Sequence, residues 1–202
     1  MGVFDYLKLI RKYRFSSLLL SGELSLLRKV FRDSYFEEKL SVVFKNIKNI
    51  SIGQNCYFGS FSTLVVANDS RYSENNSFLE IGDGTYIGEY NNIRAGGGTI
   101  RIGRNCLISQ HVSIIASNHS IWLDDLIKNQ PWSKSNNYVF IGDDVWIGCN
   151  SVILPGAKIG NGAVIASGSV VNFEVPDFAI IKGNPSKVIS YRKLKNEYSS
   201  LQ

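Results

Sequence analysis

The stretch Ile141-Gly142-Asp143-Asp144-Val145-Trp146-Ile147-Gly148 decides the fold, because it begins a series in which an aliphatic residue returns every six positions. The full series is Ile141, Ile147, Ile153, Ile159, Ile165 and Val171. A period of six matches neither the turn of an α-helix nor the simple alternation of a long strand. It fits a short strand and a turn that are repeated around a polygonal coil.

The same six-residue spacing occurs in three earlier blocks of the chain. They are Ile52, Phe58, Leu64; Ile81, Ile87, Ile93; and Ile102, Ile108, Ile114. With the long series these blocks give fifteen hexads, or five turns if three hexads close one triangular turn. Glycine often follows the aliphatic residue, as expected where backbones pack closely. The fourth residue is usually small, and Cys56 and Cys106 occupy such positions, which predicts that these thiols fill the core.

Departures from the period predict where loops leave the coil. Extra residues fall in three places: about eleven within 65–80, three at Gly96-Gly97-Gly98, and about twenty-one within 115–140. Long excursions from a rigid coil are where binding groups tend to lie. We therefore expect the functional site beside the longest excursion, at about 118–138.

The first fifty residues lack the period. Their apolar residues lie three to four positions apart among Lys and Arg, which predicts one or two amphipathic helices that cap the open end of the coil. The predicted fold is therefore mainly β. It consists of a parallel β-helix of about five triangular coils over residues 51–176, an N-terminal helical and basic cap over 1–50, and a short C-terminal loop and tail over 177–202.

The net charge of +5, from 22 Lys and Arg against 17 Asp and Glu, is concentrated near the N-terminus. Residues 1–50 contain ten basic and five acidic residues, whereas residues 51–202 contain twelve of each. Such a segment fits peripheral contact with a membrane or an anionic polymer, or a solvated helix face. No recognition motif accompanies the charge, so we expect no nucleic-acid partner.

Several classes of protein are excluded by what the sequence lacks. No apolar run approaches the roughly 18 residues of a membrane-spanning helix, and no signal-peptide pattern opens the chain. The expected location is therefore cytoplasmic, with any membrane contact peripheral and on the inner face. Three cysteines without a CxxC pair, and two histidines, are too few for a metal cage, so we expect no metal.

The chemistry must come from residues that interrupt the repeat, because a repeat alone specifies a scaffold. His119 is the leading candidate, since Ser117-Asn118-His119-Ser120 leads directly into the long excursion. A neutral imidazole exposed beside a cleft is suited to act as a general base near pH 7. The alternative is a polar corner residue. Trp122 and Trp132, on the same excursion, are candidates for stacking on a bound ring or for packing against the coil.

From about Ile81 to Ile189 the chain resembles the hexapeptide-repeat acyltransferases, whose fold is a left-handed parallel β-helix. The resemblance rests on the repeat, the histidine before an excursion, the Gly-Asp-Asp-Val-Trp-Ile-Gly segment at 142–148, and Gly183-Asn184-Pro185-Ser186-Lys187-Val188-Ile189, in this order. It points to the branch that contains maltose and galactoside acetyltransferases, and especially to bacterial polysaccharide O-acetyltransferases. The left hand of the coil is implied by this resemblance alone.

The resemblance also implies an assembly and a site. The family forms homotrimers, acetyl-CoA lies between neighbouring coils, and one histidine deprotonates the acceptor. His119 matches that histidine, whereas His111 does not. Asn91 and Trp146 match residues that position the acceptor substrate. The contacts to acetyl-CoA map onto Cys149, Ser167, Gly168, Asn172 and Lys187.

Departures from the sugar acetyltransferases narrow the expected function. Gly96-Gly97-Gly98 stands where those enzymes carry an acidic residue, and Ser120 replaces the proline that often follows the histidine. The resemblance therefore implies an acetyl-CoA-dependent O-acetyltransferase that acts on a sugar hydroxyl of a bacterial surface polysaccharide or its nucleotide-sugar precursor. Two alternatives stay open: N-acetylation of a nucleotide-linked amino sugar, and a non-catalytic solenoid scaffold.

Overall fold

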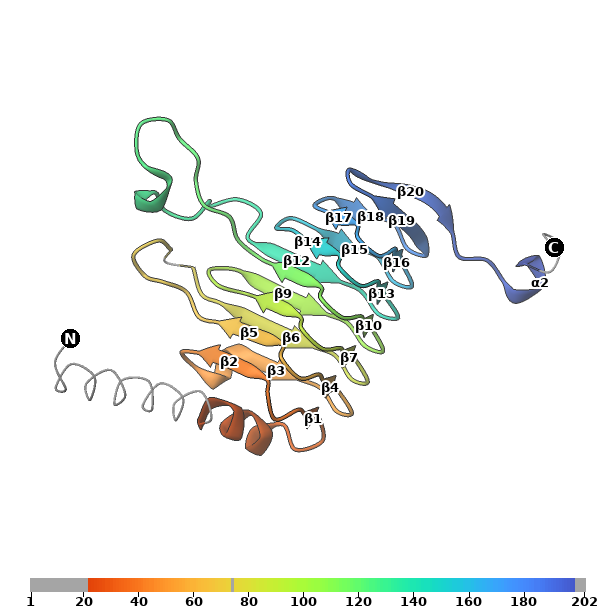
Figure 1. Cartoon of the computed structure of the whole chain (residues 1–202), viewed down its shortest axis with the longest axis horizontal. Coiled ribbons are helices and arrows are strands. Elements are labelled where there is room, and N and C mark those ends of the chain that lie inside the picture. Colours follow the sequence, from red (N-terminus) through yellow and green to blue (C-terminus); the bar gives the residue numbers. More distant parts are fainter. Residues whose placement is uncertain (1–21, 74, 199–202) are drawn as a thin grey trace, which may run out of the picture.

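Three β-sheets wind around one core in the computed structural model, which describes residues 22–73 and 75–198 (Figure 1). Successive strands enter the three sheets in turn, so three strands complete each turn of a left-handed parallel β-helix. All strand pairs are parallel except the last, between β19 and β20. The predicted fold class is confirmed.

The strands of each sheet follow one another along the coil axis. Sheet A contains β1 (Tyr35–Phe36), β4 (Tyr57–Phe58), β7 (Tyr86–Ile87), β10 (Leu107–Ile108), β13 (Trp146–Ile147), β16 (Val164–Ile165), β19 (Ala179–Gly183) and β20 (Ser186–Tyr191). Sheet B contains β2 (Ser41–Phe44), β5 (Thr63–Val66), β8 (Asn92–Arg94), β11 (Ser113–Ile115), β14 (Val152–Ile153) and β17 (Val170–Val171). Sheet C contains β3 (Ile50–Ile52), β6 (Phe78–Ile81), β9 (Thr99–Ile102), β12 (Tyr138–Ile141), β15 (Lys158–Ile159) and β18 (Glu174–Val175).

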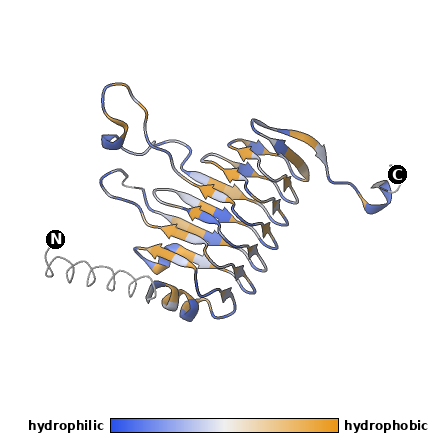
Figure 2. Ribbon diagram, in the orientation of Figure 1, coloured by the Kyte–Doolittle hydropathy of each residue, from blue (hydrophilic) through white to orange (hydrophobic). Residues whose placement is uncertain are grey.

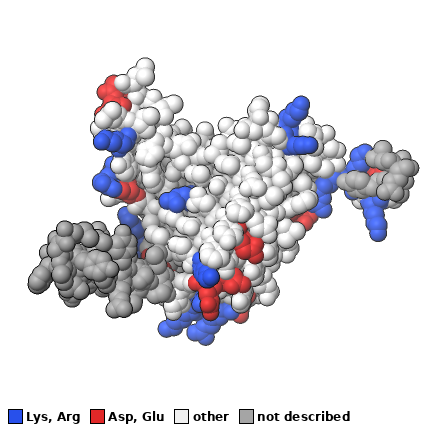
Figure 3. Space-filling view, in the orientation of Figure 1, with Lys and Arg blue, Asp and Glu red and all other residues white. Residues whose placement is uncertain are grey.

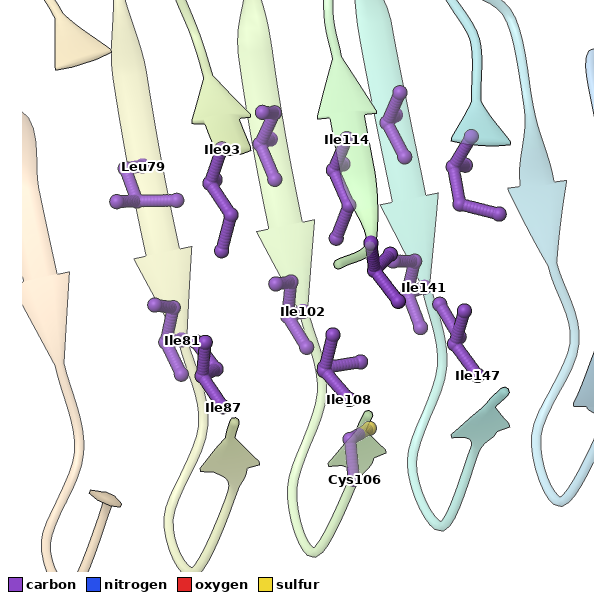
Figure 4. Packing of buried hydrophobic residues seen from close by; sticks show 14 of the residues in the cluster. Leu79, Ile81, Ile87, Ile93, Ile102, Cys106, Ile108, Ile114, Ile141 and Ile147 are labelled. Atoms are coloured by element: carbon purple, nitrogen blue, oxygen red, sulfur yellow. The ribbon is translucent and has the colours of Figure 1, made fainter. Parts of the chain in front are cut away.

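The aliphatic residue of each hexad points into the coil and stacks on its equivalents in the neighbouring coils. Ile87, Ile108 and Ile147 are exact register partners in sheet A, and all three are fully buried (Figure 4). Burial of one such side chain contributes about 1.5–3 kcal/mol. Buried and more exposed positions alternate along the longer strands, such as β5 and β6. Many strand residues are hydrophobic (Figure 2), and the six-residue period reveals the fold because it sets which of them faces inward.

Glycine follows the aliphatic residue because a side chain from the next coil needs its space. A Cβ on Gly103 would lie 2.5 Å from the carboxylate Oδ1 of Asp143. That oxygen instead accepts a hydrogen bond of 2.8 Å from the backbone N–H of Arg104. Asn161 and Asp177 repeat the arrangement one and two coils further on. The corner is thus held by a ladder of acidic and amide side chains that satisfies backbone donors.

The coil begins earlier than the sequence predicts. Residues 35–52, which the prediction placed mainly in the cap, form a complete first coil from β1, β2 and β3. Phe36 and Val42 are its inward residues and are buried. Their six-residue spacing is present in the sequence, but eight to ten further residues separate them from the isoleucines of β3, which conceals the period.

A helix over residues 22–30 covers the open end of this first coil (Figure 1). Leu24 and Leu27 point into the same core cluster as the coil residues and are buried. Burial also raises the pKa of Glu23 on this helix. A short 3-10 helix, η1 (Ile47–Asn49), precedes β3. The rest of the predicted basic cap, residues 1–21, lies outside the described residues.

The far end of the coil also differs from the expected loop and tail. β19 continues sheet A, and Ile181 lies six residues after Val175 in register with Ile165. β20 then folds back antiparallel to β19. Lys187 therefore lies on a strand, and only α2 (Lys195–Tyr198) is helical in this segment.

Two excursions leave the coil on the same side, after strands of sheet B (Figure 1). The first, residues 67–77, joins β5 to β6, and the second, residues 116–137, joins β11 to β12 and contains η2 (Ile127–Asn129). The second agrees with the excursion expected at about 118–138. A backbone hydrogen bond of 2.8 Å from Trp132 N–H to Tyr72 C=O joins the two.

Candidate functional site

His119 lies exposed at the start of the second excursion, four residues after β11. It forms an isolated antiparallel bridge with Trp132, and backbone hydrogen bonds on either side fix the pair: Ser120 N–H to Pro131 C=O at 2.9 Å, and Ser133 N–H to Asn118 C=O at 2.7 Å. The indole Nε1 of Trp132 donates a hydrogen bond of 3.2 Å to Nε2 of His119. The histidine is therefore oriented by both backbone and side chain.

Tyr72, from the first excursion, completes an aromatic cluster around His119. Its ring packs edge-on against the imidazole, with centroids 5.5 Å apart. It also lies nearly parallel to the Trp132 ring, at 6.4 Å and 9°. Arg71 places its guanidinium 5.4 Å from the centroid of the Tyr72 ring. The two excursions, far apart in sequence, thus build one wall of the site together.

Two of the three glycines at 96–98, Gly96 and Gly97, make room for Trp132. A Cβ on Gly96 would lie 3.1 Å from the indole ring, and a Cβ on Gly97 would overlap it. Gly97 also has φ +64°, which side chains rarely adopt. The sequence showed the departure, and the structure gives its physical reason: the ring of Trp132 packs on bare backbone.

The distal part of the second excursion is braced by one buried amide. Gln130 accepts a hydrogen bond of 2.8 Å from Trp122 N–H and donates to the carbonyls of Trp122 and Asp125, each at 2.7 Å. The apolar side chains at the tip remain exposed, and they are Ile121, Trp122, Leu123, Leu126 and Ile127. Trp122 thus does not pack against the coil.

Three hollows meet at Trp132, and His119 lines two of them. The largest, about 700 Å³, lies between the two arms of the second excursion. A smaller one, about 250 Å³, lies on the outer face of sheet B. A third, about 520 Å³, opens toward the first excursion. A small polar molecule in the first two hollows would contact the imidazole directly.

The hydrogen bond from Trp132 determines which nitrogen of His119 carries the proton. Because Nε2 accepts, the proton of a neutral imidazole resides on Nδ1, and the lone pair of Nε2 is the basic position. The indole N–H occupies that lone pair. A hydroxyl that replaced the indole N–H would donate to the same nitrogen, which is the contact that general-base catalysis requires.

Trp146, predicted to position the acceptor, lies on sheet A with 49% of its surface exposed. Its indole Nε1 donates a 3.2 Å hydrogen bond to Ser109 Oγ. No hydrogen bond or ring contact joins it to His119 within the described chain. The two residues are exposed on different faces of the coil.

Asn91, also predicted to contact the acceptor, is a structural residue here. Its side chain is buried at the corner between sheets A and B. Nδ2 donates to Gly88 C=O at 2.9 Å, and Oδ1 accepts from Val112 N–H at 2.7 Å. Because both ends of the amide are used inside the coil, the structure contradicts the expected substrate contact.

Three of the residues expected to contact acetyl-CoA gather at one exposed corner. Cys149 Sγ lies 3.4 Å from Ser167 Oγ, and Gly168 N–H donates to Cys149 C=O at 2.9 Å. Gly168 has φ +72°, and no atom lies within 4 Å of the position of a Cβ. The corner therefore presents bare backbone to open space.

The other two expected contacts lie apart from this corner. Asn172 is exposed after β17, at the opposite end of the sheet B strands. Lys187 is exposed on β20 and is the register partner of Lys182 on β19. Two lysines side by side form a small cationic site of the kind that meets phosphate groups.

The remaining histidine and the buried thiols take no part in this site. His111 stacks on Tyr90, with ring centroids 4.9 Å apart, at the corner between sheets A and B. Cys56 and Cys106 are buried free thiols, as predicted from their hexad positions. Burial raises the pKa of Cys106, which disfavours its reactive thiolate form.

The hexapeptide repeat is also what known proteins share with this chain. The family model described as "Bacterial transferase hexapeptide (six repeats)" matches residues 138–172. YJL218W of Saccharomyces cerevisiae, named as an acetyltransferase, is 34% identical over 142 residues, which are 70% of this chain and 69% of the relative. The chain belongs to the hexapeptide-repeat acyltransferases.

Two further similarities cover nearly the whole chain. WbbJ of Escherichia coli K12, named as a lipopolysaccharide biosynthesis O-acetyl transferase, is 29% identical over 91% of this chain and 92% of its own length. AntD, an N-acyltransferase from Bacillus cereus solved in complex with dTDP and 3-hydroxybutyryl-CoA, shares the fold with a TM-score of 0.66 at 22% identity. The matched region covers 88% of this chain and 95% of AntD.

Other curated relatives are matched over less of their length, and the chain spans about half of two of them. The hexapeptide-repeat family membership nevertheless defines the enzyme class: the chain is an acetyltransferase. Within residues 22–73 and 75–198 no cluster of three or more His, Cys, Asp and Glu is arranged to hold a metal ion. Of the helices described, none has the length and apolar character to cross a membrane.

Proposed function

We propose that this acetyltransferase transfers an acetyl group from acetyl-CoA to a sugar hydroxyl of a bacterial surface polysaccharide or its precursor. The observation that carries the choice of acceptor is the similarity to WbbJ, which extends over 91% of the chain. The aromatic wall of Tyr72 and Trp132 beside His119 supports a sugar ring as the acceptor, because sugars pack against aromatic faces.

His119 is the general base in this proposal. The acceptor hydroxyl replaces the indole N–H at Nε2, gives its proton to the imidazole, and its oxygen attacks the thioester carbonyl carbon. The C–S bond then breaks, and the departing thiolate takes the proton from the imidazolium to leave as coenzyme A. The products are an acetyl ester and the free thiol, so no other reactant is needed.

The donor is proposed to lie along the corner of Cys149, Ser167 and Gly168. Bare backbone and open space at Gly168 suit an extended pantetheine arm, and Lys187 beside Lys182 suits the phosphates of the nucleotide. Asn172 is proposed as a further contact, and Trp146 as a residue that positions the acceptor. Asn91 is left out because it is buried and fully hydrogen-bonded.

The active sites are proposed to lie between subunits of a homotrimer. His119 lies at one end of the strands of sheet B, and the corner of Cys149 and Gly168 lies at the other end. One coil therefore does not bring base and donor corner together. A second copy that presented its corner to His119 would complete the site, and three copies close such a ring.

The basic N-terminal segment is proposed to hold the enzyme at an anionic membrane surface or polymer. The support is the excess of five positive charges within residues 1–50, and no membrane-spanning helix is needed for such contact. Binding to anionic vesicles that weakens with salt supports the proposal. Binding that is insensitive to salt, for both vesicles and acidic glycan, contradicts it.

A second candidate is N-acylation of an amino sugar on a nucleotide carrier, which the fold similarity to AntD favours. The same base and donor site serve both reactions. An amine acceptor with a low pKa needs less help from a base. A His119→Ala variant that retained most of its activity on an amino sugar would therefore favour N-transfer.

The experiment that tests the proposed function is release of thiol from acetyl-CoA by wild-type, His119→Ala and His111→Asn proteins. The acceptors are neutral sugars, nucleotide sugars and surface glycans. Loss of the base lowers acceptor-dependent release by about 10²-fold or more. His111→Asn is the matched control, because His111 has φ +57°, which asparagine tolerates, and lies at another corner. No release with any acceptor, together with no binding of acetyl-CoA, would leave the scaffold alternative.

A further inference from the structure

Arg94 is the residue that neither the repeat nor the resemblance singled out. It ends β8, where Ile93 points into the core and Arg94 therefore points outward on sheet B. Its register partners are Val65 on β5 and Ile115 on β11. The guanidinium thus rises between two partly exposed apolar side chains, on the strand next to the one that leads to His119.

Arg94 shares a hollow with His119. The hollow of about 250 Å³ on the outer face of sheet B has Val65, Arg94 and Ile115 as its floor, and His119 and Trp132 as its wall. A ligand that fills it contacts the imidazole and the guanidinium at the same time. The hollow also joins, through Trp132, the two larger ones at the excursions.

The charge of these hollows is one-sided. Among the described residues that line them there are three cations, Arg71, Arg94 and Lys134, and no carboxylate. Arg71 is paired with Asp69, whose pKa the Arg71 guanidinium lowers to about 2. The side chains of Arg94 and Lys134 form no ion pair or hydrogen bond within residues 22–73 and 75–198.

Lys182 and Lys187 form another cationic site, which the proposed function assigns to the phosphates of the donor. Figure 3 shows that the coil face in view is largely uncharged, with most Lys and Arg side chains near its edges and excursions and a group of them beside acidic residues at its lower end. Elsewhere the surface arginines that the structure describes are often paired, as Arg101 is with Glu80 and Arg104 with Asp143. The guanidinium of Arg94 has no ion-pair partner among the described residues and shares a hollow with His119. It is therefore available to bind an anion.

We propose that Arg94 binds an anionic group of the acceptor, so that the enzyme acetylates acidic glycans in preference to neutral ones. The proposal rests on the proposed function. A planar guanidinium takes a carboxylate or a phosphate through two parallel hydrogen bonds. Two sources fit this chemistry: the carboxylate of a uronic acid ring, and the phosphate of a sugar phosphate or nucleotide sugar. In either case the charge fixes the sugar while one hydroxyl faces Nε2 of His119.

The test compares wild-type, Arg94→Gln and Arg94→Lys enzymes on matched acceptors. These are an oligosaccharide that contains glucuronic acid, the corresponding glucose oligosaccharide, and a nucleotide diphosphate sugar. Arg94→Gln raises KM for the anionic acceptor by about tenfold or more, and Arg94→Lys raises it less, since lysine keeps the charge but loses the fork. KM for acetyl-CoA and turnover of the neutral acceptor stay at wild-type values. Arg101→Gln, an exposed arginine outside these hollows, is the control.

The two anionic acceptors distinguish the two sources. A rise in KM confined to the glucuronic acid oligosaccharide identifies the carboxylate as the bound group, and a rise confined to the nucleotide diphosphate sugar identifies the phosphate. Equal changes for neutral and anionic acceptors overturn the proposal. A rise only in the KM for acetyl-CoA also overturns it, because Arg94 would then bind the donor. If no acceptor is acetylated at all, the proposed function fails. Calorimetry of the glucuronate oligosaccharide with wild-type and Arg94→Gln proteins then still decides whether Arg94 binds the anion.

Discussion

Trp132 and His119 are thirteen residues apart in the chain and are joined side chain to side chain, through a 3.2 Å hydrogen bond from the indole Nε1 to the imidazole Nε2. The bond exists because Gly96 and Gly97 leave bare backbone under the indole ring. It caps the only basic nitrogen of the neutral imidazole. The imidazole is therefore oriented, and its basic nitrogen is covered by the indole N–H.

Trp132→Phe keeps an aromatic ring and removes the donor. A neutral hydrogen bond contributes about 0.5–1.5 kcal/mol. In this variant the acceptor no longer has to displace the bond to His119, so we expect kcat/KM for the acceptor to rise about two- to tenfold. Steady-state kinetics with a saturating donor measure the change. A fall of tenfold or more would mean instead that the indole holds the imidazole in its reactive orientation.

The sequence predicted the coil better than its ends. The inward aliphatic residues return every six positions within each block, most clearly from Ile141 to Val171, so the period is visible without any structure. Phe36 and Val42 obey the same spacing, but the inserted residues before β3 conceal it. A repeat is recognised by its regularity, so a coil with one insertion is easily assigned to the cap.

The candidate site was predictable only in part, because it depends on contacts between excursions. His119 was found from its place before the long excursion. Its partners Tyr72 and Trp132 come from two loops, and no periodicity relates them. Asn91 was misassigned because a polar residue at a corner looks the same in sequence whether it faces solvent or the core. The one available signal for Trp132 was the glycine run at 96–98, which marks a place where something large packs.

Intersubunit complementation tests the proposed trimer. His119→Ala and Trp146→Ala change residues on different faces of one coil, so each variant alone is nearly inactive if one subunit supplies the base and its neighbour the tryptophan. Coexpression of the two variants then restores activity to about a quarter of wild type, because a random mixture leaves about one interface in four intact. Activity no greater than that of the separate variants contradicts a shared site. Light scattering gives the number of subunits in each sample.

Gly103→Ala tests the packing of the coil corner. The new Cβ would lie 2.5 Å from the Gly142 backbone and from Asp143 Oδ1, so neighbouring coils must move apart. Overpacking of this kind destabilises a fold by about 1–3 kcal/mol. Gly22→Ala is the matched control, because nothing lies within 4 Å of its Cβ position, and in a helix the change stabilises by at most about 1 kcal/mol. Denaturant midpoints of the two variants should shift in opposite directions, and equal shifts would contradict the packing argument.

Asp143→Asn tests the electrostatic part of the same corner. The Arg104 guanidinium, 2.7 Å from the carboxylate, holds the pKa of Asp143 below its ordinary value. Because the folded pKa is depressed, this stabilisation is present above the unfolded pKa of about 3.9 and is lost as pH falls through the folded value. Asp143 is 41% exposed, so the contribution stays below about 1 kcal/mol.

The asparagine keeps an oxygen for the Arg104 N–H and removes only the charge. Unfolding free energies of wild type and Asp143→Asn should therefore differ at pH 6 and converge as the pH falls through the folded pKa of Asp143, because the carboxylate is then protonated in both states. In an Arg104→Ala background the same substitution should produce a smaller difference at every pH, because the principal cation that lowers the pKa is gone. A difference that persisted unchanged at low pH, or that survived in full without Arg104, would assign the effect of Asp143 to packing at the corner rather than to its charge.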